Sequence, residues 1–175
     1  MTVYIIAGTN GSGKSTFLAN SIRSGFIPRV EYVCQGFHNA NFFSESDTVV
    51  MSPKKLRQFH LHKRLRLFNE RKPMIIEHAL ADRELFAFLK KCRKAGYRIV
   101  SIYITTPSPT VNIRNVKKRV SQGGHGCTAA KTLMRYYVAK LNYGSLKRFS
   151  DEIYIYEIAD SFIFKKAIID NEVYK

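Results

Sequence analysis

Short apolar runs alternate with longer amphipathic segments along the chain. Apolar runs bounded by turn residues predict strands at 3–7, 30–33, 73–77, 98–106, 153–158 and 162–169. Apolar residues at helical spacing and helix start signals predict helices at 14–23, 53–69, 82–94, 109–120 and 128–146. Alternating strands and helices form right-handed βαβ units. The pattern therefore predicts an α/β three-layer sandwich with a central, mainly parallel sheet and helices on both faces.

A glycine-rich turn joins the first predicted strand to the first predicted helix. Residues 8–15 read G-T-N-G-S-G-K-S and match GxxxxGK[ST] at every fixed position. The glycines let backbone N–H groups surround phosphate oxygens, Lys14 reaches the β- and γ-phosphates, and Ser15 offers its hydroxyl to Mg²⁺. The turn predicts a P-loop NTPase that binds ATP and Mg²⁺. Its cofactor-binding residues are Gly8, Thr9, Asn10, Gly11, Ser12, Gly13, Lys14, Ser15 and Thr16.

The length of 175 residues suits one domain spanning 1–175, and 45% hydrophobic residues supply a core. A phosphate loop alone occurs in kinases, GTPases, motors and transporter ATPases. The chain contains neither a guanine-reading NKxD sequence nor an ABC-type LSGGQ sequence. A compact nucleotide-dependent kinase therefore fits best.

A second basic segment, N-V-K-K-R-V-S-Q-G-G-H, occupies residues 115–125, and Arg135 follows on the next predicted helix. In phosphoryl transfer, mobile cations offset the charge on the γ-phosphate. We therefore predict a lid at about 114–135, with Arg119 beside a Gly123-Gly124 hinge. The alternative is a solvated basic helix that ends in an ordinary glycine cap.

The order of several short segments resembles the zeta toxin family, over about residues 3–142. These segments are A-G-T-N-G-S-G-K-S-T, N-A-N, I-I-E-H-A-L, K-A-G-Y-R-I, T-P-S-P, R-V-S-Q-G-G-H and M-R-Y-Y. The resemblance implies a kinase that moves the γ-phosphate of ATP to a hydroxyl of a nucleotide sugar, typically UDP-N-acetylglucosamine. It also implies a role as the toxin of a toxin–antitoxin pair.

The resemblance also implies roles for individual residues. Lys14 and Ser15 match the phosphate and magnesium positions, and Arg119 and Arg135 match two lid-side arginines that would act in catalysis. On the acceptor side, it implies that Glu77 and His125 contact the substrate, and we place His78, which stands where the family has a threonine, beside them. Glu77 also follows a predicted buried strand, and the ends of parallel strands open into the ligand crevice.

The chain departs from the family at several of these places. Asn41 stands where the family has the aspartate that takes the proton of the acceptor hydroxyl, and an amide can orient a hydroxyl but cannot accept its proton. We still place Asn41 in the catalytic and substrate site. Three carboxylates could replace the base, namely Glu45, Asp47 and Glu77; alternatively, Glu45 and Asp47 are solvated loop residues. Asn115 replaces a family arginine.

The composition adds a strong positive charge. The chain has 29 Lys+Arg against 13 Asp+Glu, a formal charge of +16 and a pI of about 9.9. Residues 48–69 contain no acidic residue, so we expect a one-sign face at Lys54–Arg66. This face could bind an acidic antitoxin protein, bind nucleic acid or steer a phosphorylated substrate; alternatively, it is a solvated surface with no partner. No sequence motif supports a nucleic-acid module.

The remaining features concern the compartment. The three cysteines lie far apart without CxxC spacing, which argues against disulfides and a zinc site. The N-terminus has no signal peptide, and no apolar stretch approaches the ~20 residues that span a bilayer. We therefore expect a cytoplasmic protein without a membrane partner.

Overall fold

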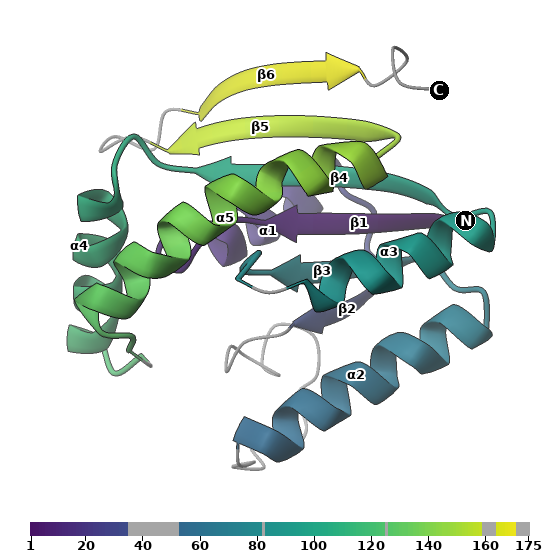
Figure 1. Ribbon diagram of the computed structural model, residues 1–175, viewed down its shortest axis with the longest axis horizontal. Coiled ribbons are helices and arrows are strands. Elements are labelled where there is room, and N and C mark those ends of the chain that lie inside the picture. Colours follow the sequence, from purple (N-terminus) through teal and green to yellow (C-terminus); the bar gives the residue numbers. More distant parts are fainter. Residues whose placement is uncertain (35–52, 82, 125, 159–163, 171–175) are drawn as a thin grey trace.

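The computed structural model describes residues 1–34, 53–81, 83–124, 126–158 and 164–170. Within them, one sheet contains six strands in the order β2-β3-β1-β4-β5-β6 (Figure 1). The strands are β1 (Thr2–Ala7), β2 (Glu31–Cys34), β3 (Met74–His78), β4 (Arg98–Thr105), β5 (Glu152–Ile158) and β6 (Phe164–Asp170). Strands β1 to β5 pair in parallel and β6 is antiparallel to β5, which confirms the mainly parallel sheet.

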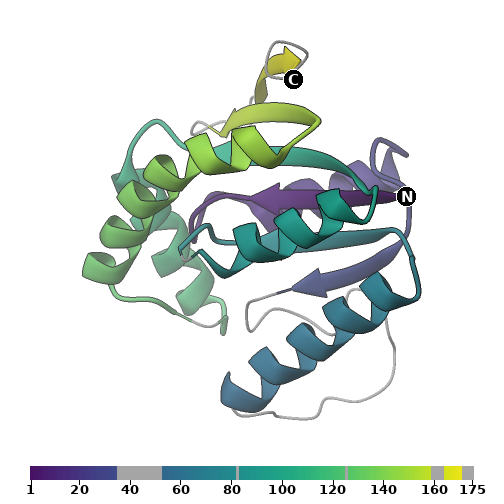
Figure 2. The ribbon, with the colours of Figure 1, turned by 45° about the vertical axis from the view of Figure 1, so that its right-hand side comes forward.

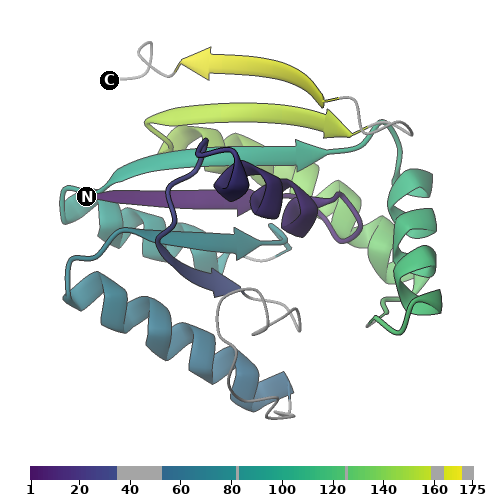
Figure 3. The same cartoon turned by 180° about the vertical axis from the view of Figure 1, so that it is seen from behind.

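Helices cover both faces of this sheet. They are α1 (Lys14–Arg23), α2 (Pro53–Asn69), α3 (Glu84–Lys94), α4 (Pro109–Ser121) and α5 (Ala129–Phe149). Helix α1 lies on one face, and α3 and α5 lie on the other (Figures 1 and 3). Helix α2 runs along the β2 edge (Figure 2). Helix α4 stands beyond the carboxyl ends of β1 and β4, where the ligand crevice of an open α/β sheet forms.

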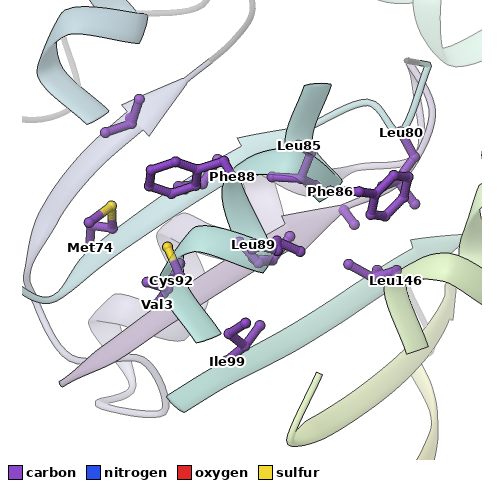
Figure 4. Packing of buried hydrophobic residues seen from close by; sticks show 14 of the residues in the cluster. Val3, Met74, Leu80, Leu85, Phe86, Phe88, Leu89, Cys92, Ile99 and Leu146 are labelled. Carbon is purple, nitrogen blue, oxygen red and sulfur yellow. The ribbon is translucent and has the colours of Figure 1, made fainter. Parts of the chain in front are cut away.

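Alternation along the strands divides the core into two clusters. In β1, Val3 and Ile5 face α3 and α5, where they pack with Leu85 and Leu89 (Figure 4). Ile6 belongs to the second cluster, on the α1 side of the sheet. Successive side chains of a strand point to opposite faces. The same alternation sends the side chains of Glu77 and His78, the last two residues of β3, to opposite faces of the sheet.

Three carboxylates from outside α2 pair with four of the cations of this helix. Arg57 and Arg64 pair with Glu84 of α3, and Lys63 pairs with Glu31 of β2 at 2.9 Å. Arg66 approaches Glu70 at 3.8 Å. The predicted one-sign face is therefore wrong for these four cations. These ion pairs could not be predicted from residues 48–69 alone, because the partner carboxylates lie outside that stretch.

The described residues include no helix that is both long enough and apolar enough to cross a lipid bilayer.

Candidate active site

The phosphate loop forms a tight cradle between β1 and α1. The N–H of Gly8 donates to the carbonyl of His78 at 3.2 Å, and that of Ser12 donates to the carbonyl of Thr9 at 3.2 Å. Helix α1 begins after Gly13, whose φ is 89°. The hydroxyls of Thr9 and Ser12 are buried and have no hydrogen-bond partner among the described residues. Phosphate oxygens would supply the acceptors that these hydroxyls need.

Lys14 lies inside this cradle. Its side chain is buried, with the residue 8% exposed, and its ammonium donates to the carbonyl of Thr9 at 2.9 Å. The first four N–H groups of a helix have no partner within that helix, and they concentrate positive charge at its N-terminus. The first turn of α1 contains no acidic residue. The loop, the ammonium and the helix end therefore all favour an anion at this place.

Glu77 connects the phosphate loop to the neighbouring strand. Strand β3 lies beside β1 with Ile6 opposite Glu77, so the carboxylate emerges next to the start of α1. The Ser15 hydroxyl lies 3.2 Å from Oε1 and 3.3 Å from Oε2, and the Tyr32 hydroxyl donates to Oε2. Glu77 is only 6% exposed. Sequence reasoning missed Tyr32, because only the parallel pairing of β2 with β3 brings it to Glu77.

Two asparagines of α4 donate hydrogen bonds to backbone carbonyls of the phosphate loop. The Asn112 amide donates to the carbonyl of Asn10 at 3.0 Å, and the Asn115 amide donates to the carbonyl of Gly11 at 2.9 Å. Asn112 is fully buried and also accepts from the Thr106 hydroxyl. Asn115, a departure from the zeta toxin pattern, thus contacts the phosphate loop directly. Its signal in the sequence is an amide one helical turn after Asn112, on the same face of α4.

We expect Gly11→Ala to destabilise the protein more than Gly25→Ala. Both glycines have a positive φ, 76° and 74°. A Cβ at Gly11 would lie 2.4 Å from the Asn112 carbonyl oxygen, whereas Gly25 has nothing within 4 Å. The strain common to both is about 1–2 kcal/mol, and overpacking adds roughly 1–3 kcal/mol at Gly11 alone. Denaturant unfolding of the two variants measures the difference in their free energies of unfolding. Equal decreases in the two variants would show that α4 can move away from residue 11 without loss of stability.

Arg119 lies near the end of α4 and is half-buried. Burial lowers the pKa of its guanidinium, and the Glu77 carboxylate opposes that shift, so the two charges interact. The Gly124 N–H donates to the Arg119 carbonyl at 3.0 Å, and a Cβ on Gly124 would lie 2.6 Å from Arg119 Cγ. Gly123 has a φ of 82°, as at a helix C-terminus. The glycine pair therefore ends α4 beside Arg119, and the lid at about 114–135 stays a prediction.

The other predicted site residues are dispersed. Arg135 is half-buried on α5, and no hydrogen bond or ion pair of its side chain occurs in the described part of the chain. His78 faces away from the phosphate loop, towards α2, so the structure separates it from Glu77. Four predicted or candidate residues lie outside the described residues: Asn41, Glu45, Asp47 and His125. Their roles stay predictions.

Comparisons with known proteins agree with this architecture. No protein-family model matches the sequence, and no curated protein matches it. The chain is similar to a structure of the PezAT toxin-antitoxin system of Streptococcus pneumoniae, with a TM-score of 0.58 and 12% identity, over 94% of this chain and 71% of that one. It is also similar to a gluconokinase from Sinorhizobium meliloti, with a TM-score of 0.52 and 13% identity. That match covers 92% of this chain and 84% of the gluconokinase chain.

The chain is also similar to AvrRxo1-ORF1:-ORF2 with ATP, with a TM-score of 0.59 and 11% identity. The match covers 96% of this chain but 57% of that one, so this chain spans little more than half its length. Identities this low concern the fold alone. The chain therefore shares the α/β fold of these structures, which include the zeta-toxin-like PezAT, and this fold agrees with the one that its sequence motifs predicted.

Proposed function

We propose that this protein is a kinase that uses ATP and Mg²⁺ to phosphorylate a hydroxyl of a small phosphorylated metabolite. A nucleotide sugar such as UDP-N-acetylglucosamine is the first choice of acceptor, on the resemblance to zeta toxins. The observation that carries the proposal is the contact of Ser15 with the buried Glu77 carboxylate at the mouth of the phosphate loop. A hydroxyl and a carboxylate beside a phosphate cradle suit nucleotide-bound Mg²⁺.

The donor set fits that metal. Mg²⁺ takes oxygen ligands and usually keeps one or two carboxylates together with substrate phosphates. Ser15 and Glu77 supply such oxygens. Bound there, Mg²⁺ would neutralise charge on the β- and γ-phosphates. Tyr32 donates to Glu77, which orients the carboxylate towards Ser15.

The remaining groups would stabilise the negative charge on different phosphate groups. The loop amides and Lys14 hold the β- and γ-phosphates, and Arg119 stabilises charge on the transferred group. Glu77 is already held by Ser15 and Tyr32, which favours a metal-side role over a role as general base. A loose, metaphosphate-like transition state needs little help from a base, so an asparagine at position 41 is compatible with turnover.

The proposal is tested with purified protein, γ-labelled ATP and Mg²⁺ against nucleotide sugars, sugar phosphates and short oligonucleotides with a free 5′-hydroxyl. We expect label on a nucleotide sugar, and we expect EDTA to remove the activity. Bound ATP without a labelled acceptor would contradict it and would favour an ATP-binding protein that acts through a partner. Label on the oligonucleotides, with strong salt dependence, would instead indicate a kinase of nucleic acid ends.

A further inference from the structure

A pocket on the far side of β3 from the phosphate loop has no part in the chemistry above. The pocket is small and partly open to solvent, and the volume available to the centre of a water-sized molecule is about 20 Å³. The apolar floor is formed by Val33 and Ile76. The polar lining comes from three elements: Arg57, His60 and Arg64 of α2, His78 of β3 and Glu84 of α3.

The two arginines share one carboxylate. Arg57 Nη2 lies 2.5 Å from Glu84 Oε2, and Arg64 Nη2 lies 2.9 Å from Glu84 Oε1. Arg64 is only 6% exposed, and its guanidinium stacks over the Phe88 ring at 4.6 Å. Its Nε is buried without a hydrogen-bond partner in the part of the chain that the structure describes. Among the described residues, two guanidinium groups thus share one carboxylate, and Arg64 Nε is a buried donor that they leave unsatisfied.

The histidines add polar atoms to the same lining. The Leu80 N–H donates to His78 Nδ1 at 2.9 Å, so the neutral imidazole carries its proton on Nε2 and can donate from there. Leu80 is fully buried with a φ of 53°, which fixes this turn. His60 Nδ1 is buried and has no hydrogen-bond partner among the described residues. Among the lining residues that the structure describes, donors are numerous and Glu84 is the one acidic group.

We propose that this pocket binds an oxyanion, a phosphate or carboxylate group, of the molecule that accepts the phosphoryl group. Guanidinium groups bind such oxyanions through charge-assisted, often bidentate hydrogen bonds. Arg57 is the adjustable member, because 66% of its side-chain surface is exposed, whereas Arg64 is fixed.

The position of the pocket matches this use. His78 directly follows Glu77 at the end of β3, so the pocket and the phosphate loop lie on opposite faces of the same strand end. An acceptor whose anionic group lies in the pocket could reach around the end of β3 to the phosphate loop with its hydroxyl. This inference rests on the proposed function and names the residues that would hold the anionic group of its acceptor.

The test titrates inorganic phosphate into the protein with ADP and Mg²⁺ at saturation, so that the phosphate loop is already filled. The imidazole resonances of His60 and His78 report the pocket by NMR. We expect them to shift saturably, and we expect Arg57→Gln to raise the Kd for phosphate about tenfold or more, since it removes a charge-assisted hydrogen bond. Arg66→Gln is the matched control, because Arg66 is an exposed cation of the same helix that approaches Glu70.

The proposed binding site would be contradicted if the imidazole resonances of His60 and His78 did not shift with phosphate. It would also be contradicted if Arg57→Gln had the same Kd for phosphate as the wild type. The acceptor assignment has its own readout: in Arg57→Gln, KM should rise for anionic acceptors and stay unchanged for neutral alcohols. Equal KM changes for both would overturn that assignment. ADP binding is measured in the same samples, so failure of the phosphate loop is recognised separately from failure of the pocket.

Discussion

Replacing Lys14 by methionine is expected to lower kcat/KM for ATP-dependent phosphoryl transfer by roughly 10²–10³-fold. The ammonium is held inside the phosphate loop by the Thr9 carbonyl, so it needs little reorganisation to reach the β- and γ-phosphates. In a buried site such a charge is stronger than in water, because the surrounding dielectric constant is lower. Initial rates over a range of ATP concentrations, together with ATP affinity by calorimetry, measure the loss.

Lys90→Met is the matched control, since it removes one lysine charge from the exposed surface of α3. Its rate should equal that of the wild type. Thermal unfolding of both variants checks that Lys14→Met still folds. If folded Lys14→Met keeps most of the wild-type rate, the loop does not position a reacting phosphate, and the kinase proposal loses its central element.

Arg119→Met should lower kcat by about 10³–10⁵-fold, the range of arginines that stabilise charge in phosphoryl transfer. The Glu77 carboxylate opposes the lowering of the Arg119 pKa by burial, so the two charges interact. Arg119 therefore lies near enough to the proposed metal site to act on charge there. Its charge is needed most when the γ-phosphoryl group is in transit. The loss should therefore appear in kcat, with little change in KM for ATP.

Lys117→Met provides the comparison for Arg119, because it removes an exposed positive charge from the same helix, two residues earlier. A general loss of positive field would slow both variants equally. A structural role for Arg119 would lower the melting temperature and change KM and kcat together. Either pattern would contradict a role in transferring the phosphoryl group.

Much of the fold follows from local patterns. The α1 boundaries, 14–23, were predicted without error, because a motif and a glycine delimit them. Helix α5 continues to Phe149, three residues beyond the predicted end at 146. Gly144 does not end it, although glycine weakens a helix interior. Its last turn packs Leu146 into the core, and burial there outweighs propensity.

The site was predictable where its residues belong to one motif or, like Glu77, end a predicted buried strand. Lys14 and Ser15 belong to one motif, whereas Tyr32 and Asn112 reach the site through strand order and helix placement. His78 shows a different limit. The match of its segment to the zeta toxin family placed it on the acceptor side with Glu77, but strand alternation sends the two side chains to opposite faces. The charges of α2 were misjudged for a third reason, since Glu84 lies on another helix.

The hydrogen bonds from α4 to the phosphate loop have a consequence for how the protein folds during synthesis. Asn112 and Asn115 contact residues that lie 102 and 104 positions earlier in the chain. Contacts this distant raise the contact order, and proteins dominated by such contacts fold slowly. Ribosomes produce the N-terminal end first, at about 5–20 residues per second. A growing chain therefore carries its phosphate motif for several seconds before α4 exists to brace it, and ATP binding should develop late, as one of the last events of folding.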